Sequence, residues 1–395
     1  MVGRKRITAG ALAASLAMLP TVSQASTLHV EVFNPGKEAV FPVTSTLIYG
    51  DHEAMLVDAQ FQRKYAQKLV ELIRASGKTL KYVFISHSDP DYYFGLAEIK
   101  RAFPSVQVLS TAQTAYLISA TKDAKLNVWG GKLGADAPEA LYVPNAIASD
   151  ELVLDNEKVL VQQNRSDPAH SYLWIPSLRT VVGGISVITG SHLWMADTPN
   201  VAEIDLWLQA IESMVSLDPK NVVPGHYSKL DTSPAQLDFI REYLQAYKQA
   251  VSTGSRSSQI IADMTGKFPD LPGRETLAFG ARAFEGEVAW HVASPYPPIG
   301  RVAEVNFGST VFRLDFKDNR TMSFEGTSGQ FKGVKDTVEY TATEVGKNVF
   351  MVYWHEPSTG SNVVHVQDWN TGVVYTNIAA RDNSFTHLRG TISIP

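Results

Sequence analysis

The sequence predicts an α+β protein in which an αββα sandwich, two β-sheets covered by helices on both outer faces, precedes a small all-β barrel. Three observations support this prediction. Strand and helix patterns alternate over residues 38–111, a mostly β region followed by two amphipathic helices fills residues 140–250, and short alternating strands follow residue 298. A chain of 395 residues is long enough for two such domains.

The first domain, assigned to residues 26–250, begins with short strands around a Gly50-Asp51 turn. Apolar residues at helical spacing predict a helix over 62–76, and "LKYVFISH" (80–87) has the continuous apolar pattern of a buried strand. We then expect a helix over 93–104 and a strand in "VQVLST" (106–111). This order of strand, helix and strand indicates a layered α/β domain.

The second half of this domain again has predicted strands followed by predicted helices. Four strand-like segments, "ELVLD", "KVLVQQ", "SYLWIP" and "RTVVGGISVI", are followed by amphipathic helices around Ile204–Val215 and Leu237–Tyr247, with the buried strand "NVVPGH" between them. Residues 251–297 are a helical and Pro-rich connector. Residues 298–395 alternate apolar and polar residues with turns at hairpin spacing, which predicts a small barrel.

The N-terminus, residues 1–25, has the pattern of a secretory signal peptide. Arg4, Lys5 and Arg6 precede an apolar stretch, and small residues surround Ala25. That stretch is too short for a membrane span. We therefore expect a periplasmic or secreted protein that does not associate with a membrane after the signal is removed.

Composition excludes several classes of function. The chain has no cysteine, so disulfides, thiolate nucleophiles and cysteine zinc ligands are excluded. A formal net charge of −5 without a long basic run argues against nucleic acid as a partner. No phosphate-loop spacing and no Gly-x-Ser-x-Gly motif occurs in the sequence. A small-molecule substrate is the expected partner, and the oligomeric state is left open.

The chemistry-bearing residues cluster where predicted strands end. "FISHSDPDYYFGL" (84–96) carries His87, Asp89 and Asp91 directly after a strand, His170 lies just before another strand, and His226 just after a third. A rigid sheet positions such loops, and imidazoles with carboxylates suit zinc, or iron or manganese. A single histidine after a strand is usually structural, so the hypothesis depends on the joint placement.

These residues resemble the metallo-β-lactamase superfamily, and more closely its branch with the motif His-x-His-Pro-Asp-His-Tyr-Phe-Gly. The similarity extends to "MLVDAQF", "GSHLWMADT" and "NVVPGHYS", and covers over half the chain. It implies metal-dependent hydrolysis. The resemblance places His87 at the first ligand, His170 at the lone histidine and His226 at the last histidine.

This sequence departs from the family pattern at three positions. Asp89 replaces the second histidine, Tyr92 replaces the histidine after Asp91, and Gly184-Ile185 replaces the Gly-Asp pair that bridges two metals. Ile185 has no donor atom. The resemblance thus implies one metal ion rather than two, held by His87, Asp89 and His170.

The remaining candidates have two interpretations each. Asp91 acts as general base or caps the following helix. Tyr92 stabilises a developing oxyanion or fills the place of the second metal. His226 binds substrate or is a weak second-site ligand, and His192 with Trp194 contacts substrate or forms a packed aromatic beside a solvated histidine. Asp58 is expected to brace the loops.

Residues 300–395 resemble the lipocalin-like domains of the MoaF type, on the strength of "FRLDFKDNRTMSFEG" and "VYWHEPSTGSNVVHVQDWNTGVVYT". This implies a barrel with room for a small apolar ligand, in which Tyr353, Trp354 and Trp369 line a pocket or belong to the core.

Two functions follow. The first is an exported metal-dependent hydrolase that acts on a small ester, lactone or amide-type substrate with a metal-activated water. The alternative is a catalytically silent ligand-binding protein that keeps the fold without the chemistry.

Overall fold

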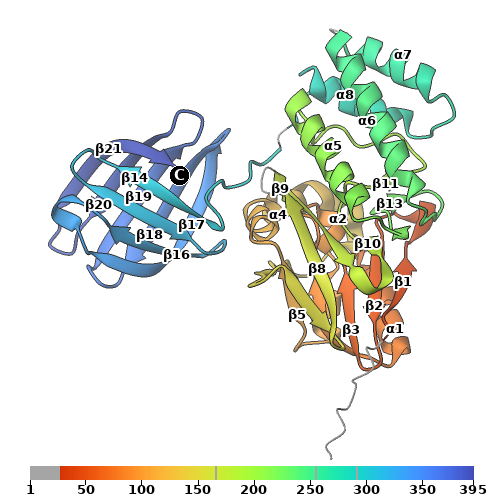
Figure 1. Ribbon diagram of the computed structural model, residues 1–395, viewed down its shortest axis with the longest axis horizontal. Helices are drawn as coiled ribbons and strands as arrows, with labels where there is room; N and C mark the ends of the chain where they lie inside the picture. Colours follow the sequence, from red (N-terminus) through yellow and green to blue (C-terminus); the bar gives the residue numbers. More distant parts are fainter. Residues whose placement is uncertain (1–26, 165–166, 254–255, 291) are drawn as a thin grey trace, which may run out of the picture.

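The computed structural model describes residues 27–164, 167–253, 256–290 and 292–395, so the predicted signal peptide lies outside the described residues. Within that part of the chain, an αββα sandwich is followed by a closed barrel of eight strands, which confirms the predicted fold class (Figure 1). No helix in the described ranges is long and apolar enough to cross a membrane.

The first sheet has six strands in the order β1-β2-β3-β4-β5-β6. Strands β1 to β3 pair antiparallel, and β3 to β6 pair parallel. The central strands are buried on both faces, which explains their continuous apolar sequence. The bounds are β1 (His29–Phe33), β2 (Ser45–Tyr49), β3 (Glu53–Val57), β4 (Thr79–Phe84), β5 (Gln107–Ser110) and β6 (Asn145–Ala146).

The second sheet has five strands in the order β12-β10-β9-β8-β7, and β11 pairs separately with β13. The bounds are β7 (Glu151–Leu154), β8 (Glu157–Asn164), β9 (Asp167–Ile175), β10 (Thr180–Val182), β11 (Ile188–Thr189), β12 (Asn221–Val222) and β13 (His226–Tyr227).

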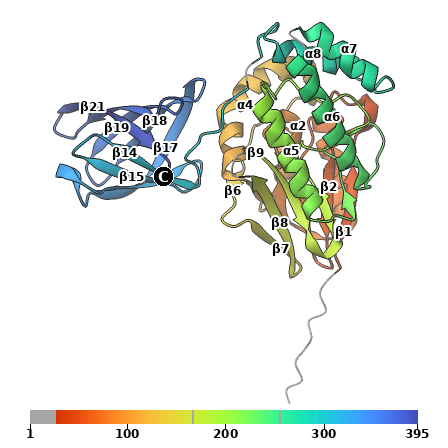
Figure 2. The same cartoon turned by 45° about the horizontal axis from the view of Figure 1, so that its top comes forward.

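Helices cover both outer faces of the sandwich (Figures 1 and 2). On the first sheet, α1 (Arg63–Ser76) and α3 (Leu96–Ala102) bury an apolar face, and the short α2 (Pro90–Tyr93) lies between them in the chain. On the second sheet, α5 (Val201–Ser216) and α6 (Ala235–Thr253) do the same. Helices α7 (Ser257–Lys267) and α8 (Arg274–Phe284) join this second core, so the segment 251–297 adds helices to the sandwich.

Helix α4 (Ala112–Leu133) was not expected from the sequence. Its apolar and polar residues do not form a single stripe, because its first turns are buried while most of its second half is exposed. The Thr111 side chain caps it by accepting a hydrogen bond from the Thr114 backbone N–H. This helix carries Lys125 to the strand ends described below.

The barrel closes by pairing its first strand with its last. Its strands are β14 (Arg301–Asn306), β15 (Val311–Phe316), β16 (Thr321–Gly326), β17 (Lys335–Gly346), β18 (Val349–Glu356), β19 (Ser361–Asp368), β20 (Val373–Ala379) and β21 (Phe385–Ser393). Trp354 is buried in its core, whereas Tyr353 is 44 % exposed. Gln113 of α4 donates to the Tyr296 carbonyl and accepts from its N–H, which ties α4 to the barrel.

Ser86 joins the two sheets. Its backbone N–H and its hydroxyl both donate to the buried Asp58 carboxyl, at 2.8 and 2.7 Å. The same hydroxyl accepts the Gly184 N–H at 2.8 Å, and the Ser86 carbonyl accepts from the Ser171 hydroxyl at 2.9 Å. Gly184 has φ +82°, and a Cβ there would lie 2.6 Å from the Ser171 carbonyl oxygen. Asp58 thus braces the loops, as expected from the sequence.

Ser86→Ala should lower the free energy of unfolding by about 1–3 kcal/mol, because it removes the hydroxyl hydrogen bond to Asp58 Oδ2 and leaves the Gly184 N–H without its partner. The backbone N–H of residue 86 still donates to Asp58 Oδ1. Urea denaturation followed by tryptophan fluorescence measures this change. Ser216→Ala, which removes an exposed helix hydroxyl, is the matched control. Equal stability of the two variants would contradict the bridging role of Ser86.

Candidate active site

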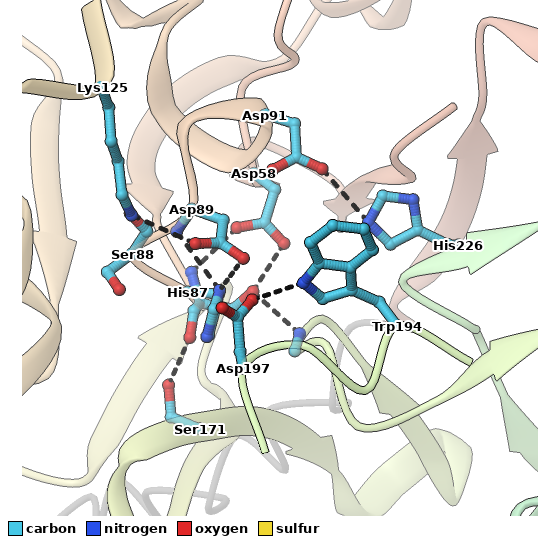
Figure 3. Close-up of polar contacts among 12 residues, drawn as sticks. Asp58, His87, Ser88, Asp89, Asp91, Lys125, Ser171, Trp194, Asp197 and His226 are labelled. Atoms are coloured by element: carbon cyan, nitrogen blue, oxygen red, sulfur yellow. Dashed lines mark hydrogen bonds and ion pairs between the residues drawn. The ribbon is translucent and has the colours of Figure 1, made fainter. Parts of the chain in front are cut away.

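Three separate segments bring the predicted site residues to one end of the sandwich. His87 and Asp89 follow β4, His170 lies within β9, and His226 begins β13. The sequence had placed His170 before its strand, but the strand starts earlier, at Asp167. Figure 3 shows His87 beside Asp89, with the Asp91 side chain turned toward His226.

His87 and His170 form a stacked pair. Their ring centroids are 5.2 Å apart and their planes differ by 17°. Burial lowers the pKa of His87 to about 3, so its ring is neutral. The Nδ1 atom of His170 lies 2.6 Å from Asp167 Oδ1. Burial lowers the pKa of His170, but the Asp167 carboxylate outweighs it and the net shift is upward.

Asp89 forms an ion pair with Lys125. The Lys125 ammonium lies 3.1 Å from Asp89 Oδ1 and donates to the Ser88 carbonyl at 2.7 Å. Asp89 Oδ2 is 3.5 Å from His87 Nδ1. Burial alone would raise the pKa of Asp89, but Lys125 and His87 outweigh it and lower the pKa to about 2. Asp89 is therefore an ionised carboxylate already neutralised by a protein cation.

Asp91 pairs with His226 instead of capping a helix. Its Oδ2 lies 3.2 Å from His226 Nε2, and only 6 % of Asp91 is exposed. Asp91 lies inside α2 and not at its N-cap, which is Asp89, and its carboxylate points across the site toward His226 of β13 (Figure 3). Asp91, the predicted general base, and His226, the predicted last histidine, are therefore paired with each other.

Tyr92 is fully buried in the core of the first sheet. Its ring makes edge contacts with His87 and His226, at 5.3 and 5.8 Å between centroids. Its hydroxyl has no hydrogen-bond partner among the described residues, and a Cβ on Gly225 would lie 3.0 Å from it. This packing favours the interpretation that Tyr92 fills space where the family has a metal ligand.

His192 and Trp194 differ from each other in their surroundings. His192 is 1 % exposed and its Nδ1 lies 3.0 Å from the Tyr243 hydroxyl, so the expected exposure of this histidine is wrong. The loop folds inward because α6 supplies that polar partner. Trp194 is half-buried, stacks on Phe279, and donates to Asp197 Oδ2 at 2.6 Å.

Four site residues were missed by the sequence analysis: Lys125, Asp167, Asp197 and Trp290. Trp290 donates to Asp197 Oδ1 at 2.7 Å, so two indoles hold this carboxylate. Burial, with a contribution from Asp89, raises the pKa of Asp197 to about 6. Asp167 stands three residues before His170, a spacing visible in the sequence. Lys125 has no local signal, because only the packing of α4 brings it to the site.

Comparison with known families agrees with these observations. Residues 39–226 match the family model of the Metallo-beta-lactamase superfamily, and residues 299–393 match the MoaF-like family. The chain therefore contains a metallo-beta-lactamase superfamily domain followed by a MoaF-like domain, which confirms both resemblances. Membership of the superfamily suggests a metal-dependent hydrolase, and its members generally bind divalent metals such as zinc.

Solved structures of metallo-beta-lactamases are similar to this chain. The enzyme from Pontibacter korlensis shares 18 % identity over 57 % of this chain and 96 % of its own, with a TM-score of 0.40. The DIM-1 metallo-beta-lactamase exposed to ceftazidime also shares 18 % identity, over 57 % and 94 % of the two chains, with a TM-score of 0.40. Among curated proteins, none matches the sequence.

The residues of this site do not fit the expected metal. In the described ranges, no group of three or more His, Asp or Glu side chains is arranged to hold a metal ion. The reason is that other residues already occupy the expected ligands. Asp89 forms an ion pair with Lys125, His226 is paired with Asp91, and the side chain of Ile185 has no donor atom. The four predicted ligands His87, Asp89, His170 and His226 are thus neighbours without forming one zinc, iron or manganese site.

The buried Asp58 generates a prediction about pH. Burial raises the pKa of its carboxyl from 3.8 to about 8, against the hydrogen bonds from Ser86. Between about pH 4 and about pH 8 the unfolded chain loses this proton while the folded protein keeps it, so this group makes the free energy of unfolding fall as pH rises.

Asp58→Asn should remove that contribution, because an amide does not titrate and asparagine tolerates the positive φ of 64° at this position. The pH slope of stability should flatten by up to about 1.4 kcal/mol per pH unit within this window. Urea midpoints of both proteins across the window measure it. Parallel slopes for the two proteins would show that Asp58 is already ionised in the folded state.

Proposed function

We propose that this protein is an exported hydrolase of a small ester, lactone or amide-type substrate, in which a histidine–aspartate pair activates the water. The contact that carries the proposal is the 2.6 Å distance between His170 Nδ1 and Asp167 Oδ1. It fixes the orientation of the imidazole and, with Nδ1 as donor, leaves Nε2 as the basic nitrogen. The His170 side chain is 36 % exposed, so solvent reaches the ring.

The chemistry needs a base and a positive charge. As a water oxygen bonds to the substrate carbonyl carbon, Nε2 of His170 accepts the water proton and Asp167 stabilises the resulting imidazolium. When the intermediate collapses, His170 returns that proton to the departing alcohol or amine. The Lys125 ammonium provides the positive charge near the developing oxyanion, in the role that a metal plays elsewhere in the superfamily.

Export is supported by the signal-like pattern of residues 1–25. The net charge of −5 supports a small-molecule partner and not a nucleic acid. The MoaF-like barrel is a second place for a small ligand, as its family resemblance implies.

The competing function is a catalytically silent ligand-binding protein. One observation favours it: the carboxylates of Asp89, Asp91 and Asp197 all have partners from the protein itself. A site whose polar groups are already paired is stable without a reaction to perform. Turnover separates the two functions, because the binding protein has none.

His170→Ala and Asp167→Asn should each lower kcat by roughly 10²- to 10⁴-fold on aryl esters and small lactones, because both remove the oriented base. KM should change far less. His355→Ala is the control, since His355 is exposed on the barrel. Wild-type protein that hydrolyses none of these substrates would favour the ligand-binding alternative.

Prolonged dialysis against a chelator should leave this hydrolysis unchanged, because the base is not a metal-bound hydroxide. Elemental analysis of protein purified without an affinity metal should find well under one zinc, iron or manganese per chain. Activity that disappears with the chelator and returns with zinc would contradict the histidine mechanism and support the metal chemistry of the superfamily.

A further inference from the structure

Among the described residues, four carboxylates at this end of the sandwich each have a partner from the protein, and for one of the four that partner is a permanent cation. Asp91 contacts His226, Asp167 contacts His170, and Asp197 accepts from two indoles. Asp89 alone among these four is paired with a lysine, Lys125. Asp89 also lies beside the stacked imidazoles, with Oδ2 3.5 Å from His87 Nδ1.

Lys125 is held in this place from two sides. Its ammonium donates to the Ser88 carbonyl at 2.7 Å and to Asp89 Oδ1 at 3.1 Å, and the side chain is only 24 % exposed. Figure 3 shows the side chain extending from its helix directly to Asp89. Lys122, one turn away on α4, pairs instead with the exposed Asp123. The contact at Asp89 is therefore specific to Lys125.

We propose that Lys125 is a built-in cation that takes the electrostatic place of a metal ion and keeps divalent metal out of this domain. An ammonium and a metal ion both require the Asp89 carboxylate, and two cations at that distance repel each other. The two imidazoles remain in place, and His170 has the carboxylate partner that orients metal-binding histidines. Removal of the ammonium frees the Asp89 carboxylate to join His87 and His170 as a three-donor set for one ion, an arrangement that the described residues do not have while Lys125 holds Asp89.

This inference does not depend on whether the protein is a hydrolase. It concerns which cation neutralises Asp89, and metal binding reports on it without any substrate. Ester assays that show no turnover would contradict the proposed hydrolase but not the role of Lys125. Metal-binding assays that fail would contradict the role of Lys125 but not the His170–Asp167 mechanism, which the kinetic variants test.

The experiment compares wild-type protein, Lys125→Met and Lys122→Met by equilibrium dialysis against zinc and against cobalt(II), with elemental analysis and the visible spectrum of bound cobalt. Methionine keeps the length of the lysine side chain without its charge. We expect about one ion per chain in Lys125→Met, bound at least ~10-fold more tightly than in the other two proteins. Asp89→Asn in the Lys125→Met background should lose the ion again.

Two controls keep the result decisive if Lys125→Met folds poorly. Lys125→Gln retains a donor for the Ser88 carbonyl, and its metal binding is measured beside that of Lys125→Met. In the wild-type protein, millimolar zinc should leave the thermal unfolding temperature unchanged. Zinc binding by wild-type protein as tight as by the variants, or folded Lys125→Met and Lys125→Gln that both bind no metal, would overturn the proposal.

Discussion

The buried contact between Asp58 and Ser86 is the constraint on which the site depends. Ser86 directly precedes His87. Its hydroxyl accepts the Gly184 N–H beside the second sheet, and its carbonyl accepts from the Ser171 hydroxyl. Ser171 in turn neighbours His170. The distance between His87 and His170 is therefore set by hydrogen bonds through one serine, in a place where unpaired polar groups would be costly.

The same frame supports a changed chemistry. Ile185 packs against the cores of both layers, and Tyr92 is buried where the family pattern has a histidine. These replacements turn donor positions into apolar packing, which stabilises a folded domain but cannot hold a second ion. The polar groups that remain pair with one another. One lysine, two histidines and two indoles form ion pairs or hydrogen bonds with four carboxylates. Fold and metal chemistry are thus separable properties of this sandwich.

Much of the fold was predictable because its signals are local. The helices α1, α5 and α6 have apolar residues at helical spacing, and the barrel strands alternate along their length. The gathering of His87, His170 and His226 was predictable from their placement beside strands. Helix α4 was missed because its residues form no apolar stripe, and the burial of His192 was missed because its partner, Tyr243, lies on α6.

The sequence by itself determined the two-domain organisation, the placement of His87, His170 and His226 in or beside strands, and the loss of the bridging carboxylate at Ile185. These follow from residue identity and short-range periodicity, which the chain carries wherever it folds. Only the tertiary structure decided which polar and charged side chains pair with each other. Lys125 and Asp89 are 36 residues apart and Trp290 and Asp197 are 93 apart, and no local pattern links them. Pairing across such separations results from packing, because it depends on where each helix comes to lie.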